Sequence, residues 1–251
     1  MLYKNNYKLP LIKLIPNFIT ILALISGISS LLFAVEDRWA EAILCIMVAS
    51  ILDGLDGRLA RLLNASTPLG AQLDSLCDFI NFGVMPGILI YFWSFQNSPQ
   101  KLISWAATLF YIMCMAFRLA RFNILSTETK TDKRLKYFFI GVPAPVGAFL
   151  ALTPIILTFA WSDYVDMDFC NNWIYLSCHL IIIGVLLASR LPTFSIKHLH
   201  IKHEYVWMAL IFFVLVALSL FVYFWYVLPL LAIFYIMSLP LSYFIYKNFK
   251  I

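Results

Sequence analysis

The sequence predicts an all-α membrane protein, a polytopic helical bundle of about eight transmembrane helices with both termini in the cytosol. Of its 251 residues, 63% are hydrophobic and 12% are charged, whereas soluble domains are roughly half apolar and about a quarter charged. This composition excludes a soluble protein. Two further observations support the prediction: the apolar residues form long runs, and lysine and arginine gather at alternate ends of these runs.

The apolar runs have the length of spanning helices, which take ~20 residues each. They cover approximately 17–35, 39–62, 71–95, 101–123, 143–161, 173–189, 205–224 and 226–246. The sixth run is the shortest, and Pro229 lies near the division between the last two. The first run has nearly full spanning length and no small-residue exit before Glu36, so we expect a permanent helix and no cleaved signal peptide.

The positive charge lies almost wholly on one side of the predicted bundle. With the N-terminus inside, only Arg38 and Lys101 of the 18 lysines and arginines fall in outer connections, which leaves 16 on the inner side. Because inner loops of membrane proteins are enriched in these residues, the bias predicts that both termini are cytosolic. The basic residues form no stripe of the kind that binds nucleic acid, and no nucleic-acid partner is expected.

We divide the chain into a juxtamembrane segment, residues 1–14, and one membrane domain, residues 15–251. The segment carries Lys4, Lys8 and Lys13 among apolar residues, so it could lie as an amphipathic helix on the anionic inner leaflet. A frayed basic tail explains the same residues equally well. Both interpretations stay open.

Zinc is not indicated anywhere in the chain. The five cysteines form no CxxC pair and fall mostly inside apolar runs, so neither a zinc site nor a disulfide framework is expected. Three histidines stand close together between residues 197 and 204, but they lie in a basic loop with one carboxylate, Glu204. A solvated interfacial loop explains them better than a metal site.

Four aspartates inside the second and third runs are the main functional signal, because ionisable groups within a membrane are costly and usually functional. Asp53 and Asp56 are three residues apart, and Asp74 and Asp78 are four apart, so each pair occupies one helix face. At ~1.5 Å per residue, all four lie ~6 to ~13 Å from the inner boundary that joins the two helices. We therefore expect the pairs to meet.

Facing carboxylates repel one another and become protonated unless cations hold them. Oxygen ligands without histidine or cysteine favour Mg²⁺ or Mn²⁺ over zinc, and these ions keep coordination positions for phosphate oxygens. The acids thus indicate two divalent cations and a diphosphate substrate, with displacement at phosphorus as the chemistry.

Gly57 and Ala60, one turn from the acids, would let a flat base or phosphate approach the backbone. We favour a phosphate contact for Arg61 and a purely orienting role for Arg58.

These residues fit the pattern D-x2-D-G-x2-A-R-x8-G-x3-D-x3-D without a gap. The matching positions are Asp53, Asp56, Gly57, Ala60, Arg61, Gly70, Asp74 and Asp78. The pattern is similar to the signature of the CDP-alcohol phosphatidyltransferases. That resemblance implies a membrane enzyme, usually dimeric, that transfers a phosphatidyl group from a CDP-lipid to an alcohol and releases CMP.

The resemblance also implies a role for each matching position. Asp53, Asp56 and Asp74 would bind the metals and the diphosphate, and Asp78 would be both a metal ligand and the general base. Gly57 and Ala60 would make room for the cytidine, with Arg61 and Gly70 beside the CDP-lipid. The segment Pro16-Asn17-Phe18-Ile19-Thr20 is similar to an opening whose Asn lies near the nucleotide, which adds Asn17 and Thr20 to the CDP-lipid site.

Over most of its length the chain resembles the phosphatidylserine synthase branch of that family. The similar segments are Ser75–Pro86, Phe117–Asn123 and Gly141–Pro145. This resemblance implies that CDP-diacylglycerol and L-serine are the substrates and that phosphatidylserine and CMP are the products. It implies a homodimer in the bacterial inner membrane, with the active site facing the cytosol.

Arg118 and Arg121 are the candidates for binding the acceptor, together with Asn81, which stands where serine is commoner in the branch. The two arginines are three residues apart on one helix face near the inner boundary, where a guanidinium can reach a carboxylate or a lipid phosphate. A serine carboxylate would need such a charge. The positive-inside bias alone also explains arginines at this position.

Three other functions would also account for some of these residues. A divalent-cation transporter would spread acids across the bilayer, whereas these four lie in its inner half. A structural scaffold does not explain four buried acids. Within the family, phosphatidylglycerophosphate synthase, with glycerol 3-phosphate as acceptor, is the runner-up, since arginine also binds phosphate.

Overall fold

The computed structural model describes residues 11–127, 138–161, 164, 168–194 and 205–248. The chain forms two compact units, Met1–Met85 and Pro86–Ile251, and each is described by itself. Most of the proposed juxtamembrane segment and the whole histidine-containing loop lie outside the described residues.

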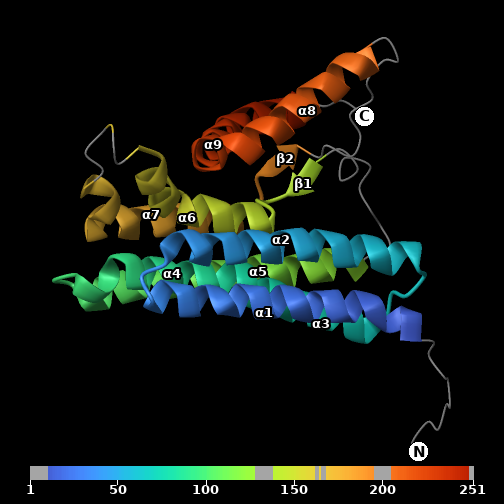
Figure 1. Cartoon of the computed structure of the whole chain (residues 1–251), viewed down its shortest axis with the longest axis horizontal. Helices are drawn as coiled ribbons and strands as arrows, with labels where there is room; N and C mark the ends of the chain where they lie inside the picture. The colour runs from blue at the N-terminus through green and yellow to red at the C-terminus, as the bar shows by residue number, and fades with distance from the viewer. Residues whose placement is uncertain (1–10, 128–137, 162–163, 165–167, 195–204, 249–251) are drawn as a thin grey trace, which may run out of the picture. The chain divides into compact units, whose positions relative to one another are not determined.

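The first unit is built on a helical hairpin. A short 3₁₀ turn, Leu11–Leu14, leads into α1 (Ile15–Val35), and α2 (Trp39–Leu62) returns beside it (Figure 1). The buried face of α1 consists of small residues such as Ala23, Gly27 and Ala34, while bulky residues such as Phe18 and Leu32 are exposed. Small residues let helix backbones approach closely in a membrane, and the bulky side chains are left for lipid.

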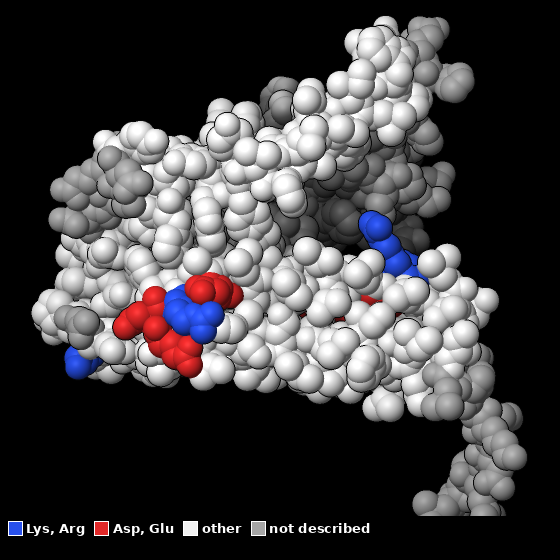
Figure 2. Space-filling model, viewed as in Figure 1, with Lys and Arg blue, Asp and Glu red and all other residues white. Residues whose placement is uncertain are grey.

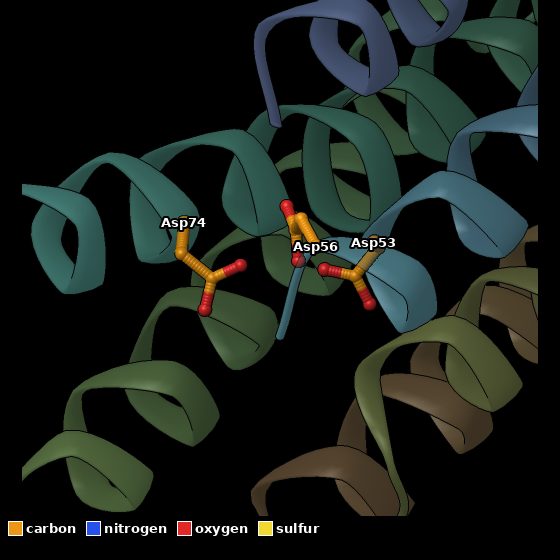
Figure 3. A group of neighbouring side chains, drawn as sticks. All are labelled: Asp53, Asp56 and Asp74. Atoms are coloured by element: carbon orange, nitrogen blue, oxygen red, sulfur yellow. The ribbon is translucent and has the colours of Figure 1, made fainter. Parts of the chain in front are cut away.

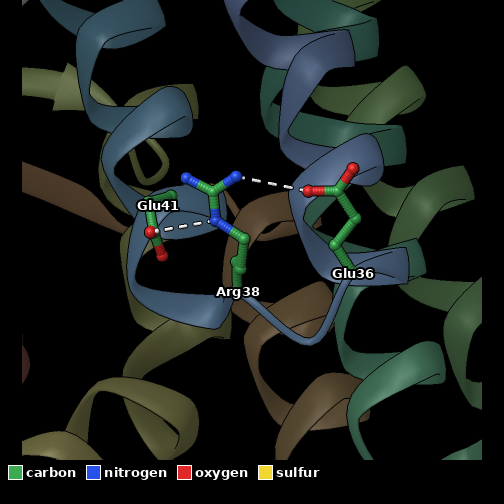
Figure 4. A network of polar contacts seen from close by, with 3 residues as sticks. All are labelled: Glu36, Arg38 and Glu41. Carbon is green, nitrogen blue, oxygen red and sulfur yellow. Dashed lines mark hydrogen bonds and ion pairs between the residues drawn. The ribbon is translucent and has the colours of Figure 1, made fainter.

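Charged side chains close the turn between α1 and α2. Asp37 has a φ of 59°, a left-handed conformation that Asp tolerates better than most residues. Arg38 bridges the two helix ends, with ion pairs of 3.3 Å to Glu36 and 3.1 Å to Glu41 (Figure 4). The pairs are exposed, so they help to define the turn and contribute little to overall stability.

The third apolar run is helical but not uniformly α-helical. α3 (Pro68–Asp78) begins with Pro68 in its first turn, and the Thr67 hydroxyl accepts a 3.0 Å hydrogen bond from the Gly70 N–H. A π-helical segment, η2 (Phe79–Val84), follows Asp78, and α4 (Met85–Trp93) completes the run. π-Helical turns are rare and frequently occur at functional sites.

The second unit contains the remaining long helices. They are α5 (Lys101–Thr127), α6 (Ala144–Trp161), α7 (Trp173–Ala188), α8 (Val206–Val222) and α9 (Phe224–Asn248), with 3₁₀ turns at Phe95–Asn97 and Asp168–Asn171. α5 packs on α7, and α6 contacts both α7 and α9. α8 and α9 form a hairpin (Figure 1).

Two short strands were not predicted. β1 (Phe138–Ile140) pairs antiparallel with β2 (Pro192–Phe194). Gly141 follows β1 with a φ of 80°, where L side chains are strained, and its N–H donates to the Leu191 carbonyl at 2.8 Å. The Thr193 hydroxyl donates back to the Gly141 carbonyl at 3.1 Å. These contacts between distant loops carry no periodic signal in the sequence, so the all-α prediction missed them.

The mainly helical class is confirmed, because every predicted apolar run carries a helix. The helix bounds differ most in the third run, which spans Pro68–Trp93, and at the end of α5, which reaches Thr127. Five helices of the described chain are long and apolar enough to cross a membrane: Ile15–Val35, Pro68–Trp93, Lys101–Leu125, Ala144–Trp161 and Phe224–Lys247. Uncharged side chains cover nearly all of the face shown in Figure 2. The chain is therefore a multi-pass membrane protein; the count of eight spans stays a prediction.

A half-buried histidine compensates for a proline inside α6. Pro154 has no N–H to donate to the Leu150 carbonyl one turn earlier. The His179 ring of α7 lies with Nε2 at 2.8 Å from this carbonyl oxygen, which assigns the proton to Nε2. Because no water competes within a membrane, a freed carbonyl needs such a partner. The pair thus joins α6 to α7.

We expect His179→Ala to lower the free energy of unfolding by about 0.6 to 1.7 kcal/mol, the range of interhelical hydrogen bonds in membranes. In a Pro154→Ala background, residue 154 regains its N–H and the loss should shrink, since the Leu150 carbonyl then has a helical donor. Thermal unfolding in detergent measures both changes. Cys178→Ala, at an exposed neighbouring position, is the matched control. Equal losses in both backgrounds would contradict the compensation.

Candidate functional site

Three of the four predicted aspartates converge in the first unit. One carboxylate oxygen from each of Asp53, Asp56 and Asp74 lies within 4.8 Å of the others (Figure 3). Asp53 and Asp56 are one turn apart on α2, and Asp74 comes from α3. Because α1 packs against both helices, it holds the two acidic faces together. Helical spacing and the shared depth predicted this meeting correctly.

The three acids offer a ligand set that suits a hard divalent cation. Asp56 is buried, with 4% of its surface exposed, and the other two are half-buried. Unbalanced carboxylates at this separation repel one another, and burial removes the water that would offset the repulsion. The group contains no histidine or cysteine ligand. Three carboxylates therefore fit Mg²⁺ or Mn²⁺.

The entry of α1 is tied to this acidic group. The Thr20 hydroxyl lies 2.5 Å from Asp56 Oδ2 and 3.0 Å from the Pro16 carbonyl, both of which can accept its proton. Asn17 points toward the start of α3, where a Cβ added at Gly70 would come within 2.8 Å of Asn17 Oδ1. Gly70 therefore leaves room for the Asn17 amide, which links the two predicted CDP-lipid positions through space.

The end of α2 is open beside the acids. A Cβ at Gly57 would meet no atom within 4 Å, and the same is true of Gly54. Ala60 is half-buried, while Arg58 and Arg61 are exposed. Gly54 and Gly57 thus border free space where a planar group could reach the backbone, and the use of Gly57 and Ala60 for the cytidine stays a prediction.

Asp78 occupies a different position from the other three acids. It is the last residue of α3 and the residue from which the π-helical segment starts, one turn beyond Asp74, and it is half-buried. It does not belong to the three-acid group of the described structure. Helical spacing alone treats the four aspartates alike, whereas the resemblance already gave Asp78 the additional role of general base.

Asn81 lies inside the π-helical segment and packs against α1. Its side chain is 1% exposed, and its Oδ1 has no hydrogen-bond partner in the described structure. A Cβ at Gly27 would overlap this oxygen, so only glycine admits the Asn81 amide. Sequence reasoning missed Gly27. The small residues Ala23 and Gly27, one turn apart in the first run, were the available signal.

The two predicted acceptor arginines, in the second unit, make different contacts. Arg118 Nε donates to the Val142 carbonyl at 2.6 Å, and its guanidinium lies over Phe122 at 5.8 Å from the ring centroid. Arg121 instead caps the end of α7, where helical N–H donors run out. It donates to the carbonyls of Ala188 at 2.7 Å, Ser189 at 2.8 Å and Leu187 at 3.3 Å.

Comparisons with known proteins match most of the chain. Residues 13–183 match the family model for CDP-alcohol phosphatidyltransferase. Three similar proteins carry the name CDP-diacylglycerol–serine O-phosphatidyltransferase. The one from Mycobacterium leprae is 36% identical over 72% of this chain, the one from Helicobacter pylori 35% over 72%, and the one from Bacillus subtilis 32% over 75%.

The aligned part covers different shares of these relatives. It spans 58% of the M. leprae protein, 73% of the H. pylori protein and 91% of the B. subtilis protein. The family-model match includes the positions of the three converging acids, because it begins before α2 and ends within α7.

Proposed function

Because this chain belongs to the CDP-alcohol phosphatidyltransferase family, we propose that it transfers the phosphatidyl group of CDP-diacylglycerol to the hydroxyl of L-serine. Phosphatidylserine and CMP are the products. The observation that carries the proposal is the convergence of Asp53, Asp56 and Asp74 within 4.8 Å, at the positions where the family signature places its metal ligands. The names of the similar proteins support serine as the acceptor.

In this proposal Asp53, Asp56 and Asp74 hold divalent cations, with Asp78 as a further ligand. Two ions, Mg²⁺ or Mn²⁺, would offset the diphosphate charge and polarise the phosphorus under attack. The Thr20 hydroxyl at 2.5 Å from Asp56 keeps that carboxylate in one orientation. Gly57, Ala60 and Asn17 form the side on which the cytidine lies, and Arg61 contacts phosphate.

Asp78 is proposed as the general base. Its carboxylate takes the proton of the serine hydroxyl as the serine oxygen attacks the phosphatidyl phosphorus. A new P–O bond forms to serine, and the P–O bond to the CMP phosphate breaks, so CMP leaves with the bonding electrons. The position of Asp78 outside the three-acid group suits this separate task.

For the acceptor, Arg118 is the better of the two predicted arginines. Arg121 places both terminal nitrogens on the last carbonyls of α7, whereas the Nε of Arg118 donates to the Val142 carbonyl at the entry of α6. We propose that Arg118 contacts the serine carboxylate, that Asn81 contributes a polar amide, and that Arg121 positions the end of α7.

The lipid substrate and the charge distribution suggest the membrane arrangement. We propose eight spans in the bacterial inner membrane, with both termini and the acidic group toward the cytosol, as a homodimer of the membrane domain 15–251 preceded by the segment 1–14. The bias of 16 cations among the 18 lysines and arginines toward one side supports this orientation.

A panel of acceptors tests the function. Purified full-length protein should release CMP from CDP-diacylglycerol with L-serine and not with glycerol 3-phosphate. Serine is expected to be the preferred acceptor because the similar proteins carry the name of a serine O-phosphatidyltransferase. Preference for glycerol 3-phosphate would indicate a phosphatidylglycerophosphate synthase instead. Absence of CMP release with every acceptor would contradict the proposed phosphatidyl transfer.

The Arg118→Gln variant sharpens this panel. The serine KM should rise roughly ten- to a hundredfold, because loss of a charge-assisted hydrogen bond lowers affinity by about that factor. The KM for CDP-diacylglycerol should stay near its original value. Serinol lacks the carboxylate, so it should be a poor acceptor for both proteins and serve as the matched control. Weaker CDP-diacylglycerol binding with unchanged serine binding would reassign Arg118 to phosphate.

A further inference from the structure

The second unit has a groove of about 570 Å³ that the proposed reaction does not use. Its wall is formed mainly by one face of α5, and Arg190, just beyond the end of α7, closes it. The lining residues are Phe117, Ala120, Arg121, Ile124, Leu125 and Arg190. Four of these are apolar and two are arginines, so the groove is amphipathic.

The arginines carry positive charge without a neutralising acid. Arg190 is exposed, it lies close enough to Arg121 for the two charges to interact, and no acidic residue lines the groove. Neither arginine forms an ion pair with a carboxylate of the described chain. The carbonyls of α7 orient Arg121 but bring only partial charges. Two neighbouring guanidinium groups favour an anion with several acceptor oxygens.

The apolar residues of the groove face outward. Phe117 is 64% exposed and Ile124 is 61% exposed, in the last turns of the candidate span Lys101–Leu125. A span ends where hydrocarbon gives way to lipid headgroups. The arginines therefore lie at headgroup height, and the exposed apolar side chains lie at the height of the first methylene groups of the acyl chains.

We propose that this groove binds an anionic phospholipid of the surrounding bilayer. Its phosphate would lie against Arg121 and Arg190, and an acyl chain would lie against Phe117 and Ile124. The volume falls within the ~300 to ~1,000 Å³ of small-molecule sites, which suits a headgroup and part of one chain. All the lining residues belong to the second unit and none is one of the three acids, and the proposal does not depend on which acceptor the enzyme uses.

Native mass spectrometry of the full-length protein in detergent tests the site, with phosphatidylglycerol and phosphatidylcholine of the same acyl chains as probes. The parent should retain phosphatidylglycerol in preference to phosphatidylcholine. Arg190→Gln should lower the retained phosphatidylglycerol roughly tenfold, the value of one charge-assisted contact, and Arg190→Lys should restore part of it. Phe117→Ser should weaken binding of both lipids.

Two control variants separate the groove from other sites. Lys101→Gln removes a cation at the opposite end of α5 and should leave lipid retention unchanged. Asp56→Asn alters the acidic group and should also leave it unchanged, so failure of the proposed reaction would not affect this result. Unaltered retention in Arg190→Gln would overturn the proposal. Displacement of the lipid by millimolar inorganic phosphate, with no effect of Phe117→Ser, would also overturn it in favour of a phosphate site.

Discussion

Removal of divalent cations is expected to abolish CMP release from CDP-diacylglycerol and serine, and added Mg²⁺ or Mn²⁺ is expected to restore it. Asp53, Asp56 and Asp74 place carboxylate oxygens within 4.8 Å of one another, and only cations make such a cluster stable in its charged form. The measurement is CMP release by purified protein before chelation, in chelator, and after replacement of each metal.

Asp56→Asn tests the same model without a chelator. Asp56 is the most buried of the three acids, so its loss should weaken Mn²⁺ binding, followed directly by titration calorimetry, as well as turnover. Glu41→Gln is the matched control, because Glu41 lies at the other end of α2 and pairs with Arg38. Full activity in chelator, or equal Mn²⁺ binding by both variants, would refute a metal site at the three acids.

The second large effect is expected for Asp78→Asn, which keeps the size of the side chain and removes its basicity. Turnover should fall by ~10² or more, the usual scale of general-base loss, while CDP-diacylglycerol binding is largely kept because the other three acids are intact. Single-turnover CMP release and equilibrium binding of the CDP-lipid separate the two quantities.

Asp74→Asn provides the comparison for Asp78, since the two lie one turn apart on α3. A metal ligand should lose CDP-lipid binding together with turnover, whereas a general base should lose turnover alone. If Asp78→Asn turns over at a near-normal rate, Asp78 is not the base. If it loses CDP-lipid binding as Asp74→Asn does, its role is that of a ligand.

Much of the helical architecture could be predicted from local sequence. Apolar runs of spanning length form helices whatever their neighbours are. Within a membrane no water can bond to the backbone, so its N–H and C=O groups must pair inside the segment. The meeting of Asp53 and Asp56 with Asp74 followed from the same regularity, since helical spacing and rise place them at one depth on joined helices.

Contacts between distant segments could not be predicted in this way. One example is the π-helical segment after Asp78, where the Asn81 amide packs against Gly27 of α1. The use of Arg121 as a cap depends on where α7 ends, 66 to 68 residues further along the chain. The strand pair joins two segments that are far apart in the chain, since α6, a 3₁₀ turn and α7 lie between β1 and β2.

The sequence was sufficient for the membrane class, the positions of the helices and the three converging acids, because each rests on periodicity and residue chemistry within one or two neighbouring helices. Packing alone settled that Arg121 caps the end of α7 while Arg118 contacts the Val142 carbonyl, that the three-acid group does not include Asp78, and that Arg121 and Arg190 line one groove. These features are contacts between side chains and partners that lie far apart in the sequence. Their energies depend on burial and hydrogen-bond geometry, which exist only after the helices have assembled.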